Sequence, residues 1–571
     1  MNQHLARLPA GLQAEVDEAL ERAGRERWAE RLWDRDASLC TGQDEAKWLK
    51  WLDAGGGGCI DLVALQAFQA EVNAASFAHV LLIGMGGSSL GPEVFAQTFG
   101  AQAGFPQLLV LDSTDPDQIR RFQAQIDPRS TLFVVSSKSG STLEPDILQR
   151  HFWAAAKEAV GDAAGSHFVA VTDPGSKLET LANQEGFRRI FAGEPQIGGR
   201  YSVLSNFGMV PAAAMGVDLD RFFASTREMV AACGPHASPK ANPGVELGCI
   251  LGTAAKGGQD KVSILASRGI ADLGAWLEQL LAESTGKQGK ALIPVDAERP
   301  GPVGAYSYDR VFAYLSLEGH DEPELDALAD GLAEAGHPLV WIDLEDRGDI
   351  GQEFFRWEVA TAIAGAVMQL DPFDQPDVEA SKIKTRKLTD QYEETGALEP
   401  ETAFVREGGI AIFADPANAQ ALQELAGART PAAYLEAHLR RAGEGDYVGI
   451  LAYLDRSHPH IDALQKIRAR IRDRKTLATV LGFGPRFLHS TGQAYKGGPN
   501  SGVFLQITHE PAQDIAVPGH RYGFKVVEAA QARGDMGVLV ERGRRVIRID
   551  LGRDVEGGLK WLADAVEAAL G

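Results

Sequence analysis

The segment Phe133-Val-Val-Ser-Ser-Lys-Ser-Gly-Ser-Thr-Leu-Glu144 reads as a strand, a polar loop and the start of a helix. Its first residues are apolar and β-branched, and an unbroken polar run then extends from Ser136 to Thr142. Backbone N–H groups at a helix start attract anions, and Lys138 adds a positive charge. The segment therefore predicts a phosphate site. A serine-rich cap on an ordinary crossover helix is the alternative interpretation.

The composition and net charge of the chain limit which classes of molecule it is expected to bind. The chain has 571 residues, which predicts about three domains, and a net charge of −22. That charge argues against nucleic acid and anionic membranes as partners, so an anionic substrate would need a local positive pocket. Its apolar runs are too short to span a bilayer. The four cysteines form no C-x-x-C pair, which favours reduced thiols and a cytoplasmic location.

From residue 79, strand and helix patterns alternate, which predicts a mostly parallel sheet. Ligands of such sheets bind beyond the carboxyl ends of the strands, where the Gly84–Pro92 loop and the Ser136 loop both lie. The Gly84 loop has Ser89 where a dinucleotide fingerprint needs glycine, so we expect no nucleotide cofactor. Instead, the loop is expected to hold a neutral hydroxylated ligand through its backbone and Ser88. The strands expected here are Val80–Ile83, Leu108–Leu111, Leu132–Val135 and Phe168–Val171.

Two charged residues stand out farther along the chain. Arg200 follows two glycines, which would let its guanidinium point into a cleft, although a surface arginine beside a turn is the alternative. A second α/β unit begins at Val262–Ala266, and Glu283 lies at the last turn of its next helix. There the helix dipole disfavours a carboxylate, and a carboxyl with a raised pKa suits a general base. A solvated pair with Lys287 at i+4 is the other interpretation.

These motifs occur in the order found in glucose-6-phosphate isomerases, which the chain resembles over about residues 75–390. A longer similarity, reaching the C-terminus, is to the isomerase half of fused transaldolase–glucose-6-phosphate isomerases. A transaldolase barrel takes about 250 residues, and roughly 70 precede the first sheet, so we expect none in this chain. The segments that carry the resemblance are Ile83–Pro92, Ser136–Thr142, Gly198–Ser202, Glu283–Lys287 and Pro372–Lys382.

The resemblance implies a fold, a reaction and a set of residues. The fold would comprise two sugar-isomerase domains of the flavodoxin-like, parallel-sheet type. The reaction would interconvert glucose 6-phosphate and fructose 6-phosphate through a cis-enediol, as in glycolysis and gluconeogenesis. Glu283 would move the proton, Arg200 would stabilise the enediolate and Lys382 would contact the ring-oxygen end. The expected substrate-binding residues are Gly87, Ser88, Ser137, Lys138, Ser139, Thr142 and Gln375.

The histidine that would open the sugar ring departs from the family pattern. Family members carry it between the glutamate and lysine segments, where this chain has only His320 and His337 in unexpected contexts. The matching segment, Leu488–Gln493, lies beyond the lysine, and we assign the role to His489. A structural histidine in a turn is the alternative. The chain shows no metal motif, and we expect neither a metal nor another cofactor.

The pattern divides the chain into four parts. We expect a helical N-terminal segment over 1–72, sugar-isomerase domains over 73–220 and 221–392, and a C-terminal α/β domain over 393–571 that carries His489 to the cleft. A homodimer is possible. Two other functions stay open: a broader glucose/mannose 6-phosphate isomerase, and a sugar-phosphate sensor without catalysis.

Overall fold

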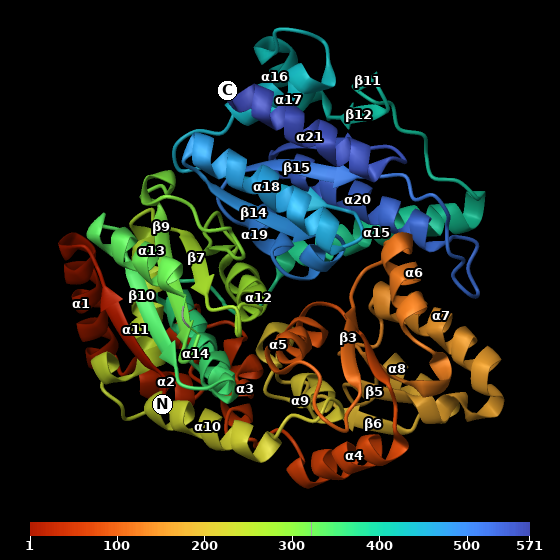
Figure 1. The fold of residues 1–571 in the computed structure, drawn as a ribbon. Helices are drawn as coiled ribbons and strands as arrows, with labels where there is room; N and C mark the ends of the chain where they lie inside the picture. Colours follow the sequence, from red (N-terminus) through yellow and green to blue (C-terminus); the bar gives the residue numbers. More distant parts are fainter. Residues whose placement is uncertain (321) are drawn as a thin grey trace.

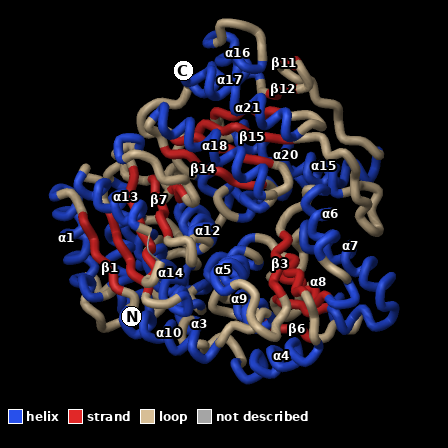
Figure 2. The backbone as a smooth tube through the Cα atoms, in the orientation of Figure 1, coloured by secondary structure: helices blue, strands red, loops and turns tan. Residues whose placement is uncertain are grey.

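Three separate sheets organise the chain, each the centre of one lobe (Figure 1). The computed structural model describes residues 1–320 and 322–571. Strands lie inside each lobe and helices surround them (Figure 2). This arrangement confirms the predicted α/β class with mostly parallel sheets. Across the described chain, no helix is both long and apolar enough to cross a bilayer.

The first lobe contains a fully parallel sheet in the order β3-β2-β4-β5-β6. The three central strands are short apolar runs that are buried on both faces, as expected when helices cover both sides, whereas the edge strands are partly exposed. The strands are β2 (His79–Ile83), β3 (Gln107–Leu111), β4 (Thr131–Ser136), β5 (Phe168–Thr172) and β6 (Arg189–Ala192). The helices are α4 (Leu62–Ala75), α5 (Leu90–Phe99), α6 (Pro116–Gln125), α7 (Leu143–Val160), α8 (Lys177–Gln184) and α9 (Asn206–Ala214).

The second lobe contains the sheet β1-β10-β9-β7-β8, which is parallel except for β1. Its strands are β1 (Gln3–Arg7), β7 (Lys261–Ala266), β8 (Ile293–Val295), β9 (Arg310–Leu317) and β10 (Leu339–Leu344). The helices are α1 (Ala10–Arg25), α2 (Trp28–Trp33), α3 (Trp51–Ala54), α10 (Leu219–Ala232), α11 (Pro243–Lys256), α12 (Leu273–Thr285), α13 (Pro323–Glu334) and α14 (Ile350–Met368).

The N-terminal segment, expected to be helical over 1–72, begins with a strand. β1 pairs antiparallel with β10 at the edge of the second sheet, and α1 packs against α11 of the same lobe. β1 is short and half polar, so its stability comes from pairing with β10 and not from an apolar pattern of its own. The predicted boundary at residue 72 therefore does not coincide with a change of lobe.

The third lobe contains the sheet β11-β12-β16-β15-β13-β14, in which β13 to β16 are parallel and β11 and β12 are antiparallel. Its strands are β11 (Val405–Glu407), β12 (Ile410–Phe413), β13 (Tyr447–Ala452), β14 (Ala478–Phe483), β15 (Gly502–Thr508) and β16 (Arg545–Asp550). The helices are α15 (Pro376–Thr395), α16 (Pro416–Leu425), α17 (Pro431–Arg440), α18 (His458–Lys475), α19 (Gly492–Gly497), α20 (Phe524–Glu541) and α21 (Val555–Leu570).

Shared apolar cores fix the lobes against one another. Phe95 of α5 packs on Phe222 and Phe354, which joins the first lobe to the second. Another core contains Ile293 of β8 together with Tyr495 of α19, so the third lobe also packs on the second. α15, most of which falls within the predicted second domain over 221–392, packs against α20 of the third lobe (Figure 1).

Candidate active site

Arg200 and Glu283 form a buried ion pair between the first two lobes. Arg200 lies in a 3₁₀ turn, Gly199–Tyr201, and is 2% exposed. Its Nη1 lies 3.3 Å from Oε1 of Glu283, which stands in the last turn of α12. Nη1 also donates to Gln375 Oε1 at 2.9 Å, and Nε donates to Ser284 Oγ at 2.8 Å. With Nη2 held by two backbone carbonyls as well, the guanidinium is fixed beside the carboxylate.

Glycines let three loops meet at this point. A Cβ on Gly87 would lie 1.9 Å from the Gly199 carbonyl oxygen, so only glycine fits there. Gly86 has a φ of +55°, and a Cβ there would lie 2.8 Å from the His489 carbonyl oxygen. The Gly84 loop therefore packs directly against the loops that carry Arg200 and His489. Ser88, which follows Gly87 in this loop, is buried.

A glutamine connects Glu283 to the loop of His489. Gln279 stands one turn before Glu283 on α12, and its Nε2 lies 2.9 Å from both Glu283 Oε2 and the His489 carbonyl oxygen. Lys287, the expected local partner of Glu283, instead donates to Asp371 and Asp374. Glu283 is therefore held by Arg200 from another segment and by Gln279 of its own helix, and not by its i+4 neighbour.

The imidazole of His489 contacts a buried carboxylate on the first lobe. Nε2 of His489 lies 3.0 Å from Oε1 of Glu144, which stands at the start of α7. Gln531 of α20 donates to the same oxygen at 2.6 Å. Burial alone would raise the pKa of Glu144, but the charge and hydrogen bond of His489 outweigh it and hold that pKa below its ordinary value. Glu144 is thus suited to orient the imidazole and to stabilise its protonated form.

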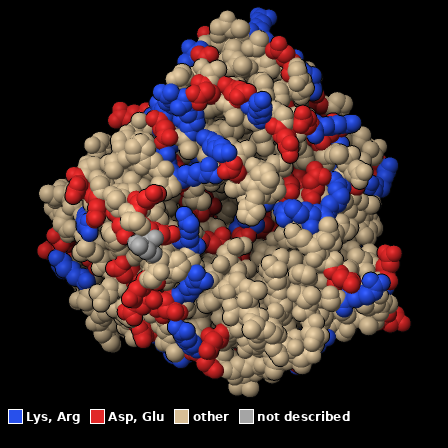
Figure 3. All heavy atoms as spheres, viewed as in Figure 1, with Lys and Arg blue, Asp and Glu red and all other residues tan. Residues whose placement is uncertain are grey.

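A cavity of about 620 Å³ opens beside this pair. Its lining brings the predicted phosphate loop of the first lobe together with α15 and with the His489 loop of the third lobe. Lys382 contributes a partly exposed ammonium from α15, at 42% side-chain exposure. In Figure 3, the face shown is hollowed near its middle, with Lys/Arg and Asp/Glu side chains both at the rim. The lining includes Ser139, Thr142, Glu144, Lys382, His489 and Gln531.

Comparison with known proteins supplies the family. The family model described as phosphoglucose isomerase matches residues 67–293, which include Arg200 and Glu283. A glucose-6-phosphate isomerase from Rubrobacter xylanophilus is 31% identical over 363 residues, 54% of this chain and 81% of the relative. The chain belongs to the phosphoglucose isomerase family. A glucose-6-phosphate isomerase from Thermus thermophilus is 30% identical over 360 residues, 54% of this chain and 82% of the relative.

Solved structures share the fold. A hypothetical protein from Thermus thermophilus superposes with a TM-score of 0.57 at 27% identity, over 67% of this chain and 99% of that one. A glucose-6-phosphate isomerase from Chlamydia trachomatis has a TM-score of 0.52 at 21% identity, over 67% and 85%, which shows the fold alone. As a phosphoglucose isomerase family member, the chain is an enzyme that isomerises sugar phosphates.

Two predicted phosphate ligands of this family member stand apart from the cavity. The Lys138 ammonium lies 2.6 Å from Asp173 Oδ2 and donates to the Glu194 carbonyl oxygen at 2.8 Å. Ser137 lines a neighbouring cavity of about 330 Å³ together with Gly140 and Thr142. Its Oγ is buried and, among the described residues, has no hydrogen-bond partner. Of the four predicted phosphate ligands, Ser139 and Thr142 line the same cavity as His489.

The other candidate histidines lie elsewhere. Nε2 of His320 accepts a hydrogen bond from Arg347 at 3.1 Å, and His337 stacks on Tyr308. Neither residue lines the cavity beside Glu144. The fold thus brings the backbone of the His489 loop to Gln279, which also contacts Glu283.

Sequence reasoning did not single out three residues of this network. Glu144 ends the segment that carries the phosphate loop, and its place in the first turn of α7 was the available signal. Gln279 precedes Glu283 by one helical turn, so a shared face was predictable. Gln531 gave no signal, because α20 lies hundreds of residues from Glu144 in the sequence.

Proposed function

We propose that this enzyme interconverts glucose 6-phosphate and fructose 6-phosphate through a cis-enediol, with Glu283 as the base. The observation that carries the proposal is the continuous contact from Arg200 through Glu283, Gln279 and the His489 loop to Glu144. It combines a fixed cation, a carboxylate and an oriented imidazole, the three groups that an aldose–ketose isomerisation needs. None of these steps requires a metal.

In the proton-transfer step, Glu283 takes the proton from C2 of the open-chain aldose and returns it to C1. The hydroxyl proton moves from O2 to O1, so the product is the ketose and the atoms balance. Negative charge develops on the oxygens of the enediolate, where the Arg200 guanidinium is already fixed by Ser284, Gln375 and backbone carbonyls. Because these donors are held before the substrate arrives, little reorganisation is needed during the reaction.

Ring opening precedes this step and falls to His489. The imidazole protonates the ring oxygen while Glu144 holds its Nε2 side and supports the positive charge. Lys382 shares the cavity with His489 and is proposed to contact the ring-oxygen end of the sugar. Gly87, Ser88 and Gln375 would contact the sugar where the three loops meet.

The phosphate is proposed to bind at the loop before α7. Ser139 and Thr142 line the cavity, and the N-terminus of α7 favours an anion there. Ser137 offers an unpartnered buried hydroxyl beside them, as far as the described residues go. Lys138 would have to leave Asp173 to reach the phosphate, so we expect it to contribute less than the hydroxyls.

We also propose a division of labour among the lobes. The sugar-isomerase domains, over about residues 73–220 and 221–392, supply the phosphate loop, Arg200 and Glu283. The C-terminal domain, over about residues 393–571, supplies His489. All these groups come from one chain, so catalysis in a monomer is expected even if the enzyme forms a homodimer.

The test is a coupled assay of fructose 6-phosphate conversion on the wild type and Glu283→Gln. Loss of the base should lower kcat by about 10²–10⁴-fold, while binding of fructose 6-phosphate by calorimetry changes little. Glu18→Gln on the exposed face of α1 is the matched control. A loss of only a few-fold would refute Glu283 as the base. A wild type that binds the sugar phosphate without turnover would favour a sensor.

A further inference from the structure

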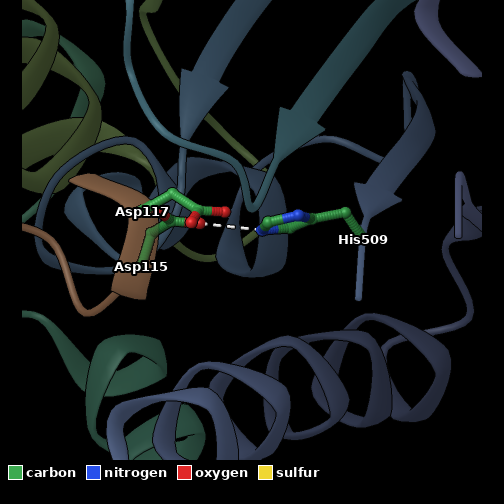
Figure 4. Close-up of side chains that lie close together, drawn as sticks. All are labelled: Asp115, Asp117 and His509. Atoms are coloured by element: carbon green, nitrogen blue, oxygen red, sulfur yellow. Dashed lines mark hydrogen bonds and ion pairs between the residues drawn. The ribbon is translucent and has the colours of Figure 1, made fainter. Parts of the chain in front are cut away.

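Three potential metal ligands gather at a second junction between the first and third lobes. Asp115 caps the start of α6, Asp117 lies in its first turn, and His509 follows β15. One ligand atom from each lies within 4.8 Å of the others. Figure 4 shows both carboxylates turned toward the imidazole, and Nε2 of His509 lies 2.8 Å from Oδ2 of Asp115.

The position of this cluster is one where parallel sheets bind ligands. In the third sheet, the chain passes from β13 to β14 on one side and then to β15 on the other. Ligands of such sheets bind beyond the carboxyl ends of the strands at this change of direction. His509 lies just beyond the carboxyl end of β15, and the loop with Asp115 lies beyond that of β3. The catalytic loops occupy the corresponding place in the first sheet, between β2 and β4.

A buried fourth carboxylate points independently to a bound cation. Glu528 of α20 is 4% exposed, and its Oε1 has no hydrogen-bond partner in the described part of the chain. Burial, together with the charge and hydrogen bond of Asp115, raises the pKa of Glu528 well above its ordinary value. Among the three carboxylates here, Asp117 accepts a hydrogen bond from Arg120. Within the described residues, Asp115 and Glu528 have no arginine or lysine partner. Such a group is stable when protonated or when it ligates a cation.

We propose that Asp115, Asp117, His509 and Glu528 form a binding site for one divalent first-row metal ion of the Mn²⁺ or Zn²⁺ type. Carboxylate oxygens and a neutral imidazole are ligands for these ions, whereas the imidazole disfavours Mg²⁺ and Ca²⁺. An atom that ligates a metal carries no proton, so the ion displaces any proton held at a ligand atom. Metal binding therefore releases protons to solvent.

The ion would fasten the lobe that carries His489. Glu528 stands one turn before Gln531 on α20, and Gln531 accepts from Thr114 at 2.6 Å while donating to Glu144. A metal at this site joins α6 to α20 and β15 and so keeps Gln531 against Glu144. The role is structural and separate from the proton transfer at Glu283, so failure of either proposal leaves the other standing.

The experiment is a titration of the EDTA-treated, dialysed full chain with MnCl₂, followed by the EPR signal of free Mn²⁺ and by calorimetry, with ZnCl₂ and MgCl₂ in parallel. One Mn²⁺ or Zn²⁺ per chain is expected, with Mg²⁺ binding at least about tenfold weaker. Asp117→Asn and His509→Ala should each weaken binding by at least about tenfold. Asp117 is 40% exposed, so this variant should fold. Asp162→Asn and His236→Ala, both at exposed positions, should bind like the wild type.

Two results would overturn the metal site. One is the lack of saturable Mn²⁺ or Zn²⁺ binding up to millimolar concentration, which would mean that a proton alone satisfies Glu528 and Asp115. The other is binding of unchanged affinity in both Asp117→Asn and His509→Ala, which would put the ion elsewhere.

Discussion

Two histidines of the third lobe each meet a carboxylate of the first lobe, in different surroundings. His489 lies 3.0 Å from Glu144, and His509 lies 2.8 Å from Asp115. The first pair lines a cavity of about 620 Å³ and receives a neutral donor, Gln531, on its carboxylate. The second pair is joined by the carboxylate of Asp117, in the first turn of α6, and by that of Glu528 on α20.

The difference shows that the neighbours of a histidine–carboxylate pair determine its chemistry. Gln531, the donor to Glu144, is neutral, so a single carboxylate charge faces the His489 imidazole. This arrangement suits proton transfer. Additional carboxylates beside Asp115 accumulate negative charge, which suits a cation or a shared proton. As proposed, the same pairing supports catalysis in one place and metal binding in the other.

Replacing His489 is expected to have the largest effect, and to affect catalysis without affecting metal binding. In His489→Ala, kcat for fructose 6-phosphate should fall by about 10²–10⁴-fold, because the general acid for ring opening is lost. Mn²⁺ binding should stay at the wild-type level, since His489 is not one of the proposed ligands. The coupled assay and the Mn²⁺ titration measure the two effects on one preparation.

His236→Ala, at an exposed turn, controls for the loss of an imidazole as such. If His489→Ala keeps activity within a few-fold of wild type, the ring is opened by another group, and the catalytic half of the comparison is wrong.

Arg486, three residues before His489, offers a second way to break the comparison. Its guanidinium pairs with Glu93, and its Nη1 lies 3.0 Å from Asp112 Oδ2, both buried on the first lobe. Burial opposes the charge of Glu93, but Arg456 and Arg486 hold its pKa at about 2. Arg486→Met leaves these carboxylates with Arg456 alone. The free energy of unfolding should fall by about 3–5 kcal/mol.

Urea unfolding followed by tryptophan fluorescence measures this loss, with Arg553→Met as the exposed control. We expect kcat to fall as well, because the segment that carries His489 loses its attachment to the first lobe. A change in unfolding free energy below about 1 kcal/mol would show that Arg486 does not fasten this segment.

The sequence predicted the strands that are apolar and buried but not those that depend on their partners. β2, β4 and β5 are continuous apolar runs, which the pattern of apolar and β-branched residues reveals. β1 is half polar and β8 has three residues, so their pairing with β10 and β7 could not be inferred from local pattern.

The same limit applies to the two sites. Arg200 and Glu283 were predictable as functional candidates, but their contact was not, because the local pattern favoured Lys287 as the partner of Glu283. Asp115 and His509 are 394 residues apart in the chain, and neither belongs to a spaced motif. Such a cluster arises from the packing of two sheets, which a single sequence does not reveal.

The smallest of the expected effects tests the support that Glu144 gives to His489. Glu144→Gln replaces a charged partner with a neutral one, which should lower kcat by about 10–100-fold, the equivalent of about 1.5–3 kcal/mol for a charge-assisted hydrogen bond. The coupled assay measures this loss, and Glu18→Gln is the control. Unchanged kcat would mean that Glu144 does not orient the imidazole.

The pH dependence of the free energy of unfolding is a second test of the Glu144→Gln variant. Because the pKa of Glu144 is lowered in the folded protein, the unfolded state binds more protons as the solution is acidified. The stability from the His489–Glu144 pair is therefore full above the unfolded carboxyl pKa of about 4.3 and is lost as the pH falls through the lower folded value. The difference in unfolding free energy between the wild type and Glu144→Gln should shrink over that acid range. A difference that stays constant with pH would assign the effect to shape and not to charge.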